Sequence, residues 1–349
     1  MKTLAIIAAA ALQVAALAYM AGEREWVLRT GRVVYLRTTP MSPQDAMRGD
    51  YVQLNYEIAQ VPVSLCRDGL AGRRLAPGAV PLDTRVYASL RENEDGLAEI
   101  VSLSDRRPGG GLFLRGYADR PWEWGGGSWR RVRYGIEAWF MQQGKSAKLE
   151  EASWRKGAEV PLEMEVAVSP SGLGVLKGYR WARLGIGLDL DFPPQKDAAE
   201  NGRRGLPRAA TIRLLNAGDK DLAVVDLPGG RSLGLAPDQQ WTENPWRWVH
   251  EGEAQPQPAP QDVIVLKPGQ AHKIRLDFKD PVWSVVKGGT PRSAKAGPKP
   301  LSQATDDYSA TFRFEYRPPD RAACKGLPNA DLIWHGRLPT STFCTYRVD

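Results

Sequence analysis

The chain has 349 residues, a formal net charge of +7 and a hydrophobic fraction of 42%. This length allows roughly two domains, and the composition excludes a wholly disordered chain and a protein with many membrane spans. Three cysteines and three histidines exclude a disulfide-dense scaffold and a four-cysteine zinc site, and they argue against a multi-histidine metal centre. We therefore expect no metal and no cofactor.

The amino terminus carries an uncharged run over residues 3–22, between Lys2 and Glu23. As a helix this run would be about 30 Å long, which matches the hydrocarbon core of a bilayer. We therefore predict a membrane anchor or signal segment over residues 1–22. The small-residue stretch Ala16-Leu17-Ala18 leaves a cleaved signal peptide as the alternative. Both interpretations place the bulk of the chain outside the cytoplasm.

Short apolar runs separated by Gly, Pro and Asp turns predict a β-rich domain over residues 23–192. The clearest alternation runs from Val52 to Ile58 and puts Leu54 and Tyr56 on the same face. One short helix is expected from Ser146 to Trp154. Further strands are expected at residues 32–39, 82–90, 98–103, 112–117 and 163–168.

A polar, turn-rich stretch over residues 193–208 is predicted to be a linker. Residues 209–349 then show short alternating strands without helical periodicity, which is typical of an antiparallel β-sandwich similar to an immunoglobulin-like fold. Its strands are expected at residues 210–214, 222–227, 263–266, 274–278, 308–316, 331–335 and 342–348. The predicted fold class is mainly β: an amino-terminal transmembrane helix, a β-rich domain with a short helix, and an immunoglobulin-like sandwich.

The most specific local pattern is an octapeptide that begins with a turn and continues into the alternating strand. Gly49 permits the backbone angles of a turn, and Asp50 can accept hydrogen bonds from its N–H groups. Leu54 and Tyr56 face the core, while Tyr51 faces away. We interpret the motif as fold-forming, with a ligand-binding role for Asp50 and Tyr51 as the alternative. The full pattern is Gly49-Asp50-Tyr51-Val52-Gln53-Leu54-Asn55-Tyr56.

This octapeptide resembles the pattern that names the GDYXXLXY family of bacterial membrane-anchored proteins. Residues 134–140, with the sequence Tyr-Gly-Ile-Glu-Ala-Trp-Phe, are similar to a second block of that family. The resemblance covers about residues 1–180. It implies a single-pass protein of the bacterial cell membrane whose bulk lies on the periplasmic side. It implies no activity, because the family has no established one.

Aromatic residues and arginines gather in one segment of the first domain, at Trp122, Trp124, Trp129, Arg130 and Arg131. Such side chains on loops are typical of a surface that binds a protein, a glycan or a lipid headgroup, although tryptophans also pack inside cores. We therefore predict a non-enzymatic binding or assembly module. Its expected partners are the lipid bilayer, through the amino-terminal helix, and another membrane or envelope protein.

The excess positive charge is concentrated in residues 105–133 and 281–305. Because both segments are rich in Gly or Pro, we interpret them as loop-like patches. Local patches on an exported protein favour a membrane face or an acidic partner, and we expect no nucleic-acid partner.

Two other functions stay open. A membrane-associated hydrolase of the Ser/Lys type would use Ser42 as the nucleophile and Lys145 or Lys148 as the base, which requires a desolvated lysine. A carbohydrate-binding protein would expose tryptophans as a platform, either in residues 122–129 or in residues 241–248.

The cysteines permit one cross-link. In an oxidising compartment Cys324 and Cys344 would be able to close a loop of about 20 residues, worth about 3 kcal/mol in the chain-entropy model. Two unpaired thiols are the alternative.

Overall fold

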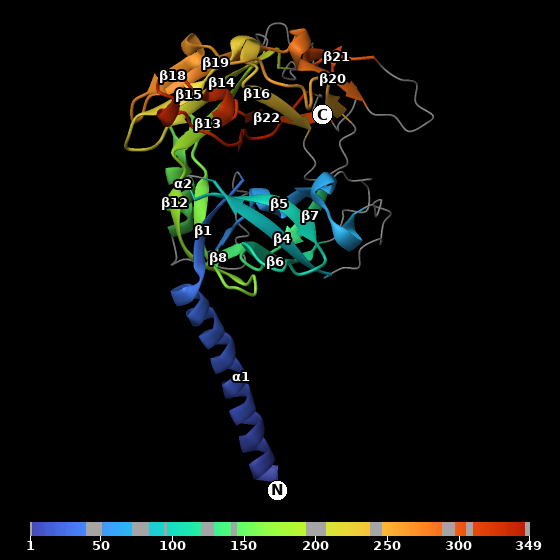
Figure 1. The fold of residues 1–349 in the computed structure, drawn as a ribbon, viewed down its shortest axis with the longest axis vertical. Helices are drawn as coiled ribbons and strands as arrows, with labels where there is room; N and C mark the ends of the chain where they lie inside the picture. Colours follow the sequence, from blue (N-terminus) through green and yellow to red (C-terminus); the bar gives the residue numbers. More distant parts are fainter. Residues whose placement is uncertain are drawn as a thin grey trace, which may run out of the picture. The chain divides into compact units, whose positions relative to one another are not determined.

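The protein is described by a computed structural model over residues 2–39, 51–71, 84–93, 96–119, 129–140, 145–192, 207–237, 246–287, 297–304 and 310–345. Within these ranges the chain is mainly β and its sheets are antiparallel, as the sequence predicts (Figure 1). It forms two compact units. Unit 1 comprises Met1–Pro121, Gly127–Ser146 and Leu162–Arg180, and unit 2 comprises Trp122–Gly126, Ala147–Pro161 and Trp181–Asp349.

Unit 1 begins with the long helix α1 (Lys2–Thr30). Among the side chains of this helix that the structure describes, Val27 near its end is the buried one, with 2% exposed. The Gly31 N–H donates to the Val27 carbonyl at 2.8 Å, and a side chain at Gly31 would lie 2.6 Å from that oxygen, so the close approach requires glycine. Among the residues that the structure describes, no helix combines the length and the apolar character needed to cross a bilayer.

The sheets of unit 1 follow directly from alternating sequences. In one inner strand of the largest sheet of unit 1, Val86, Ala88 and Leu90 point inward and are at most 7% exposed, because successive side chains of a strand point to opposite faces. This sheet has the order β3 (Gln60–Pro62), β7 (Trp129–Arg133), β6 (Phe113–Ala118), β4 (Arg85–Glu92) and β5 (Ala98–Ser104). A three-stranded sheet has the order β1 (Arg32–Arg37), β11 (Leu162–Val168) and β12 (Gly174–Trp181), and β2 (Tyr51–Gln53) pairs with β8 (Ala138–Phe140).

For residues 52–58, the predicted burial of alternate side chains is confirmed, but the predicted strand is too long. Leu54 and Tyr56 are 0% and 1% exposed, but the strand ends at Gln53 and is followed by a 3-10 turn, η1 (Glu57–Ala59). The short partner strand β8 explains the early end, because it offers pairing to three residues only. Two more 3-10 turns follow, η2 (Val63–Leu65) and η3 (Asp68–Leu70).

Unit 2 contains a five-stranded sheet and a second group of strands on the other side of a common core. The sheet has the order β19 (Ala271–Asp277), β14 (Ala209–Asn216), β13 (Leu184–Asp191), β10 (Ala158–Glu159) and β9 (Trp154–Arg155). In the second group β22 (Thr311–Tyr316) pairs with β16 (Leu233–Pro237), β23 (Leu338–Pro339) and β24 (Phe343–Cys344). Smaller sheets are formed by β15 (Leu222–Val225) with β18 (Val263–Leu266), and by β17 (Trp246–Trp248), β20 (Ser284–Lys287) and β21 (Lys299–Pro300).

Helices and 3-10 turns connect these strands. The predicted helix is present as α2 (Lys145–Ser153), and a short helix, α3 (Arg321–Cys324), follows β22. The 3-10 turns are η5 (Pro228–Gly230), η6 (Pro260–Asp262), η7 (Pro281–Trp283), η8 (Leu301–Gln303) and η9 (Ala330–Leu332).

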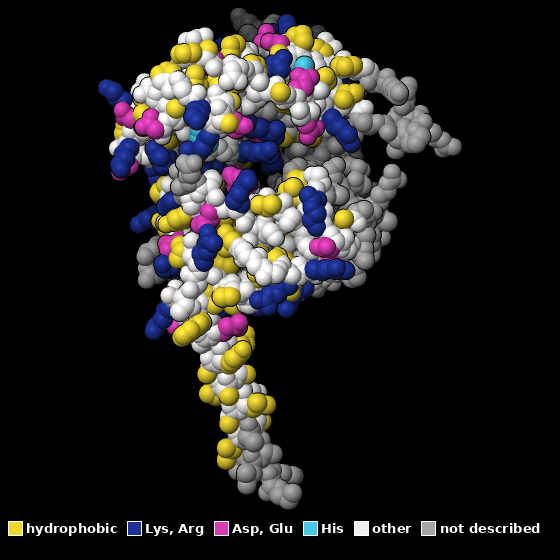
Figure 2. All heavy atoms as spheres, viewed as in Figure 1, with side chains coloured by type: hydrophobic (Ala, Val, Ile, Leu, Met, Phe, Trp, Pro, Cys, Tyr) yellow, Lys and Arg dark blue, Asp and Glu magenta, His cyan; other side chains and the backbone are white. Residues whose placement is uncertain are grey.

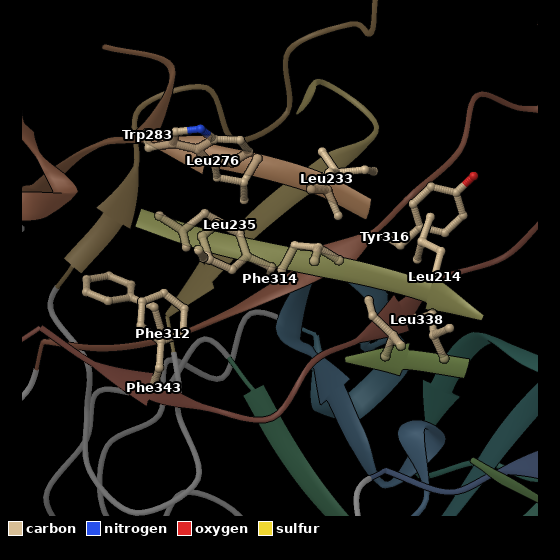
Figure 3. Close-up of a cluster of buried hydrophobic side chains, with 14 of the residues drawn as sticks. Leu214, Leu233, Leu235, Leu276, Trp283, Phe312, Phe314, Tyr316, Leu338 and Phe343 are labelled. Atoms are coloured by element: carbon tan, nitrogen blue, oxygen red, sulfur yellow. The ribbon is translucent and has the colours of Figure 1, made fainter. Parts of the chain in front are cut away.

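The core of unit 2 is built from the inward-facing residues of both groups of strands (Figure 3). Phe312, Phe314 and Tyr316 alternate along β22 and are fully buried. Phe314 stacks on Phe343 with ring centroids 5.1 Å apart, and it meets Trp283 edge to face at 5.3 Å. Such aromatic pairs stabilise a core beyond their buried area.

Two predictions for the carboxy-terminal half need correction, and a third is not tested by the described residues. Residues 184–191 were assigned to the first domain, but β13 pairs with β14 of unit 2 along its whole length, since local turn signals do not reveal which sheet a strand joins. Residues 331–335 form no strand: the segment begins inside η9, which starts after Asn329 with its φ of 55°. The predicted linker lies outside the described residues between 193 and 206.

Candidate functional site

The octapeptide over residues 49–56 is joined, through its strand β2, to residues 134–140, which are the second block of the family resemblance. β2 pairs with β8 in the antiparallel register Tyr51↔Phe140, Val52↔Trp139 and Gln53↔Ala138. Beyond the last pair, the Leu54 N–H donates to the Glu137 carbonyl at 2.7 Å. Two segments about 80 residues apart in sequence are therefore joined directly. We call these two segments together, residues 51–58 and residues 134–140, the motif brace.

Two tyrosines fasten the motif brace from opposite sides. The Tyr56 hydroxyl donates to the Ile136 carbonyl at 2.8 Å, and the Tyr134 hydroxyl donates to the Ile58 carbonyl at 2.8 Å. Both side chains are buried. Burial, and to a smaller extent the nearby Glu137 carboxylate, raises the pKa of both phenols above the usual range, so both hydroxyls stay protonated and remain donors.

Glu137 shapes the turn that offers the Ile136 carbonyl to Tyr56. Its carboxylate accepts from the N–H groups of Tyr134 and, at 2.9 Å, of Gly135. Gly135 has a φ of +80°, a conformation that residues with a side chain rarely adopt. A glycine and a carboxylate two residues later thus fix this turn, which explains their place in the second block.

The motif brace is also tied to the three-stranded sheet of unit 1. Thr38 forms a β-bridge with Tyr56, and the Thr39 N–H donates to the Asn55 carbonyl at 2.7 Å. On its other side the Thr38 N–H donates to the Leu162 carbonyl of β11 at 2.9 Å. The brace therefore connects parts of unit 1 that belong to different sheets.

A buried ion network lies next to this connection. Arg37 and Glu163 are each 5% exposed, and Arg37 Nη2 lies 3.0 Å from Glu163 Oε1. Arg180 Nε contacts the second carboxylate oxygen at 2.7 Å, and the Arg180 guanidinium lies 3.7 Å from the centroid of the Tyr35 ring. A single carboxylate thus contacts two guanidinium groups, one of them inside the unit, and its charge balances that of one of them. This network was not predicted from the sequence, in which the arginines of β1 and the glutamates of β11 are the signal: Arg32, Arg37, Glu163 and Glu165.

The predicted motif residues fall into two groups. Gly49 and Asp50 lie outside the described residues, and for Tyr51 only the backbone pairing in β2 is described. Leu54 and Tyr56 are buried, as expected of core-facing residues. The polar atom of Tyr56 is used in a bond within unit 1, so it serves the fold.

The predicted Trp/Arg surface is described only in part. Trp122 and Trp124 lie outside the described residues, and Trp129 and Arg130 are described only as backbone of β7, paired with Pro62 and Val61. Arg131 is exposed, and its Nε lies 3.8 Å from Asp119 Oδ2.

In the second tryptophan group, Trp241 lies outside the described residues. Trp246 is 1% exposed, and Trp248 stacks on Trp283 with centroids 5.9 Å apart. Trp246 packs in the core of unit 2, so it is not available for a carbohydrate-binding platform formed by residues 241–248.

The residues proposed for a Ser/Lys hydrolase are not brought together by described parts of the chain. Ser42 lies outside the described residues, and Lys145 is described only as helix backbone. Lys148 is exposed, whereas a lysine base needs desolvation. Within the described ranges no group of three His, Cys, Asp or Glu side chains is arranged to hold a metal ion.

The disulfide considered between Cys324 and Cys344 is not formed, since Cys324 is a thiol. Cys344 pairs with Thr311 at one end of β22, whereas Cys324 follows the other end, in α3. A strand of this length spans about 17 Å, and a disulfide requires Cα atoms within about 7 Å. Burial, followed by the Asp320 carboxylate, raises the pKa of the Cys324 thiol, which keeps it protonated and unreactive.

Glu315 provides a pH-dependent contribution to the stability of unit 2. Burial acts to raise its pKa, but the charges of Arg317 and Arg313 outweigh burial and hold the pKa below its usual range. A carboxyl whose pKa is lower in the folded state stabilises the fold above the unfolded value of about 4.3, and this stabilisation is lost as the pH falls through the folded value. We expect Glu315→Gln to weaken the acid-side loss of stability.

This prediction is checked by hydrogen exchange of β22 between pH 3 and pH 7. Glu251→Gln, which replaces an exposed glutamate of the same unit, serves as the matched control. An equal response of both variants to acid would contradict a special role for Glu315.

Comparison with known proteins places the motif brace in a family. The family model described as GDYXXLXY protein matches residues 13–178. The matched range contains both segments of the brace and the Arg37–Glu163 pair, and it ends within β12. No curated protein and no solved structure matches the chain.

Proposed function

Residues 13–178 belong to the GDYXXLXY family, and from this premise we propose that the protein is a membrane-anchored binding or assembly module of the bacterial envelope. In this proposal α1 crosses the cell membrane once, and both units lie on the periplasmic side. Unit 1 is a non-enzymatic platform near the membrane that binds another membrane or envelope protein. We further assign unit 2 to the immunoglobulin-like sandwiches, because strands on two sides share one core.

The contrast between the two ends of α1 is the observation that carries this proposal. Val27, near its end, is buried against unit 1. Figure 2 shows hydrophobic side chains on the coloured part of this helix. Earlier than Val27, these large apolar side chains are each 59–74% exposed: Ile6, Ile7, Leu12, Val14, Leu17, Tyr19 and Met20. Water does not stabilise such a helix, whereas lipid chains do.

The residues after the apolar run support a membrane interface. Glu23, Arg24 and Glu25 end the run, and Trp26 is 69% exposed. Trp26 lies about 6 Å beyond Gly22 along the helix. Exposed tryptophans at this depth are typical of the headgroup region of a bilayer.

The binding role is supported by the chemistry of the motif brace. Its tyrosine hydroxyls and the Glu137 carboxylate form hydrogen bonds within unit 1. Groups engaged in this way stabilise a scaffold, and they provide no nucleophile or base. Crosslinking of the full-length chain in native membranes would identify the partner.

We expect the full-length chain to stay in the membrane pellet after an alkaline carbonate wash. Replacing Leu12 and Leu17 by lysine should release it, since each lysine near the middle of a spanning helix costs about 3 kcal/mol. The measurement is the distribution of the intact chain between pellet and supernatant, with its amino terminus verified by mass.

The matched control replaces the same two residues by valine, which keeps the helix apolar, and this variant should stay in the pellet. Release of the wild-type chain with an intact amino terminus would contradict membrane anchoring. Loss of residues 1–18 from the mature chain would instead establish the cleaved signal peptide.

A further inference from the structure

The end of unit 1 from which α1 emerges is formed by segments distant in sequence. α1 packs beside the end of β11, because a side chain at Gly31 would meet Ala167 Cβ and Val168 N at 3.2 and 3.1 Å. Residues 169–173 turn directly after this point, closed by the Ser169 N–H donating to the Leu173 carbonyl at 2.9 Å. This turn is therefore next to the helix exit.

The loop over residues 105–112 packs on the same turn. Arg107 Nη2 donates to the Pro170 carbonyl at 3.0 Å. The neighbouring strand is fixed by the Arg115 N–H, which donates to the Gly172 carbonyl at 2.8 Å. We call residues 105–112 the basal loop. Figure 2 shows Lys and Arg side chains at this end of unit 1.

The charges at this end are paired unequally. Arg29 contacts Glu25 at 2.8 Å, and Arg32 contacts Glu92, so these arginines are neutralised locally. Arg106 and Arg107 are exposed, and no described carboxylate forms an ion pair with either of them. Asp105, beside them in sequence, is turned toward the Gly69 N–H at 3.1 Å. The basal loop thus presents two positive charges that no described carboxylate balances.

The basal loop also has the geometry of an anion contact. Arg107 is held in place by Pro170 and by the Phe113 ring, whose centroid is 5.8 Å from its guanidinium. A guanidinium fixed in this way loses little entropy when its other N–H groups bind a phosphate. Gly109, Gly110 and Gly111 follow, and no heavy atom lies within 4 Å of where a side chain would begin at any of them, so a ligand can approach the backbone.

We propose that Arg106 and Arg107 bind the phosphate groups of anionic phospholipids at the surface of the membrane that holds α1. This inference rests on the proposed membrane anchor. Gly31 lies about 14 Å beyond Gly22 along the helix, so the basal loop starts next to the headgroup layer. The contact would fix the orientation of unit 1 on the membrane.

The test uses the full-length chain with Leu12→Lys and Leu17→Lys, which leaves the sheets and loops of unit 1 unaltered and makes the basal loop the main membrane contact. Its binding is measured by co-sedimentation with vesicles of 30% phosphatidylglycerol in phosphatidylcholine and with vesicles of phosphatidylcholine alone. We expect preference for the anionic vesicles. Adding Arg106→Gln and Arg107→Gln should weaken this binding by about 25-fold, at about fivefold for each arginine.

The matched control adds Lys273→Gln and Lys279→Gln instead, which removes the same charge from exposed residues of unit 2 and should leave the binding within twofold. Binding to the anionic vesicles should also fall at 0.5 M NaCl, because salt screens exposed charges. Equal weakening by both pairs, or no preference for anionic vesicles, would overturn the proposal and would favour an acidic protein as the ligand. Neither result would affect the carbonate test, which depends on Leu12 and Leu17 in the otherwise unaltered chain.

Discussion

Replacing Glu163 by glutamine is expected to destabilise unit 1 by about 3–5 kcal/mol, because the buried Arg37 guanidinium then loses the charge of the carboxylate that it contacts. Arg37 and Glu163 are each 5% exposed and lie 3.0 Å apart. The measurement is urea unfolding of the full-length chain, with hydrogen exchange of β1 and β11 to assign the transition to unit 1. Such assignment is needed because two units do not unfold as one two-state system.

Two further variants separate the pair from its surroundings. Replacing Arg37 and Glu163 together by methionine should cost much less than Glu163→Gln, since a buried ion pair and apolar residues of similar volume have similar stability. Arg180→Gln should cost about 1 kcal/mol or less, because this side chain is 38% exposed and water screens its charge. If Glu163→Gln and Arg180→Gln have equal effects, burial of the Arg37 charge is not the cause.

Replacing Tyr134 by phenylalanine is expected to destabilise unit 1 by about 1–3 kcal/mol, because the Ile58 carbonyl then loses its buried donor. Tyr56→Phe should have a similar effect through the Ile136 carbonyl. Tyr117→Phe is a suitable control, because its hydroxyl bonds an exposed arginine at the surface and its loss should change the stability by less than about 0.5 kcal/mol. An unchanged stability of both brace variants would contradict the structural role of the motif.

These hydroxyls also define the alkaline limit of the fold. Burial raises the pKa of Tyr56 and Tyr134, so each tyrosine stabilises the folded state fully below its unfolded pKa of about 10. This stabilisation decreases as the pH rises beyond that value, because the unfolded chain then releases the proton that the folded chain keeps.

In unit 1 the sequence predicted which side chains are buried better than it predicted which strands and charged residues pair with one another. The alternation from Val52 to Ile58 identified the buried side chains correctly, since burial depends on direction alone. It did not predict that the strand ends at Gln53, because that depends on the length of β8. The pairing of Arg37 with Glu163 joins residues 126 positions apart, and no local pattern carries this information.

The pairing of the arginines could not be predicted from the sequence either. The sequence indicated a basic segment over residues 105–133, but the structure divides its members. Arg131 and Arg133 lie 3.8 and 3.5 Å from the Asp119 carboxylate, whereas Arg106 and Arg107 lie beside the turn that follows β11. Charge counted along the chain does not tell which arginines are neutralised, because the pairing depends on how the strands meet.

Residues 51–58 and 134–140 form one structural element that two tyrosine hydroxyls hold together. Native-state hydrogen exchange of the full-length chain with Tyr134→Phe tests it most directly, with peptides that cover each segment. We expect protection to decrease in both segments by the same factor, because the Tyr134 hydroxyl donates to the Ile58 carbonyl of the other segment. A decrease confined to residues 134–140, with residues 51–58 unchanged, would contradict it.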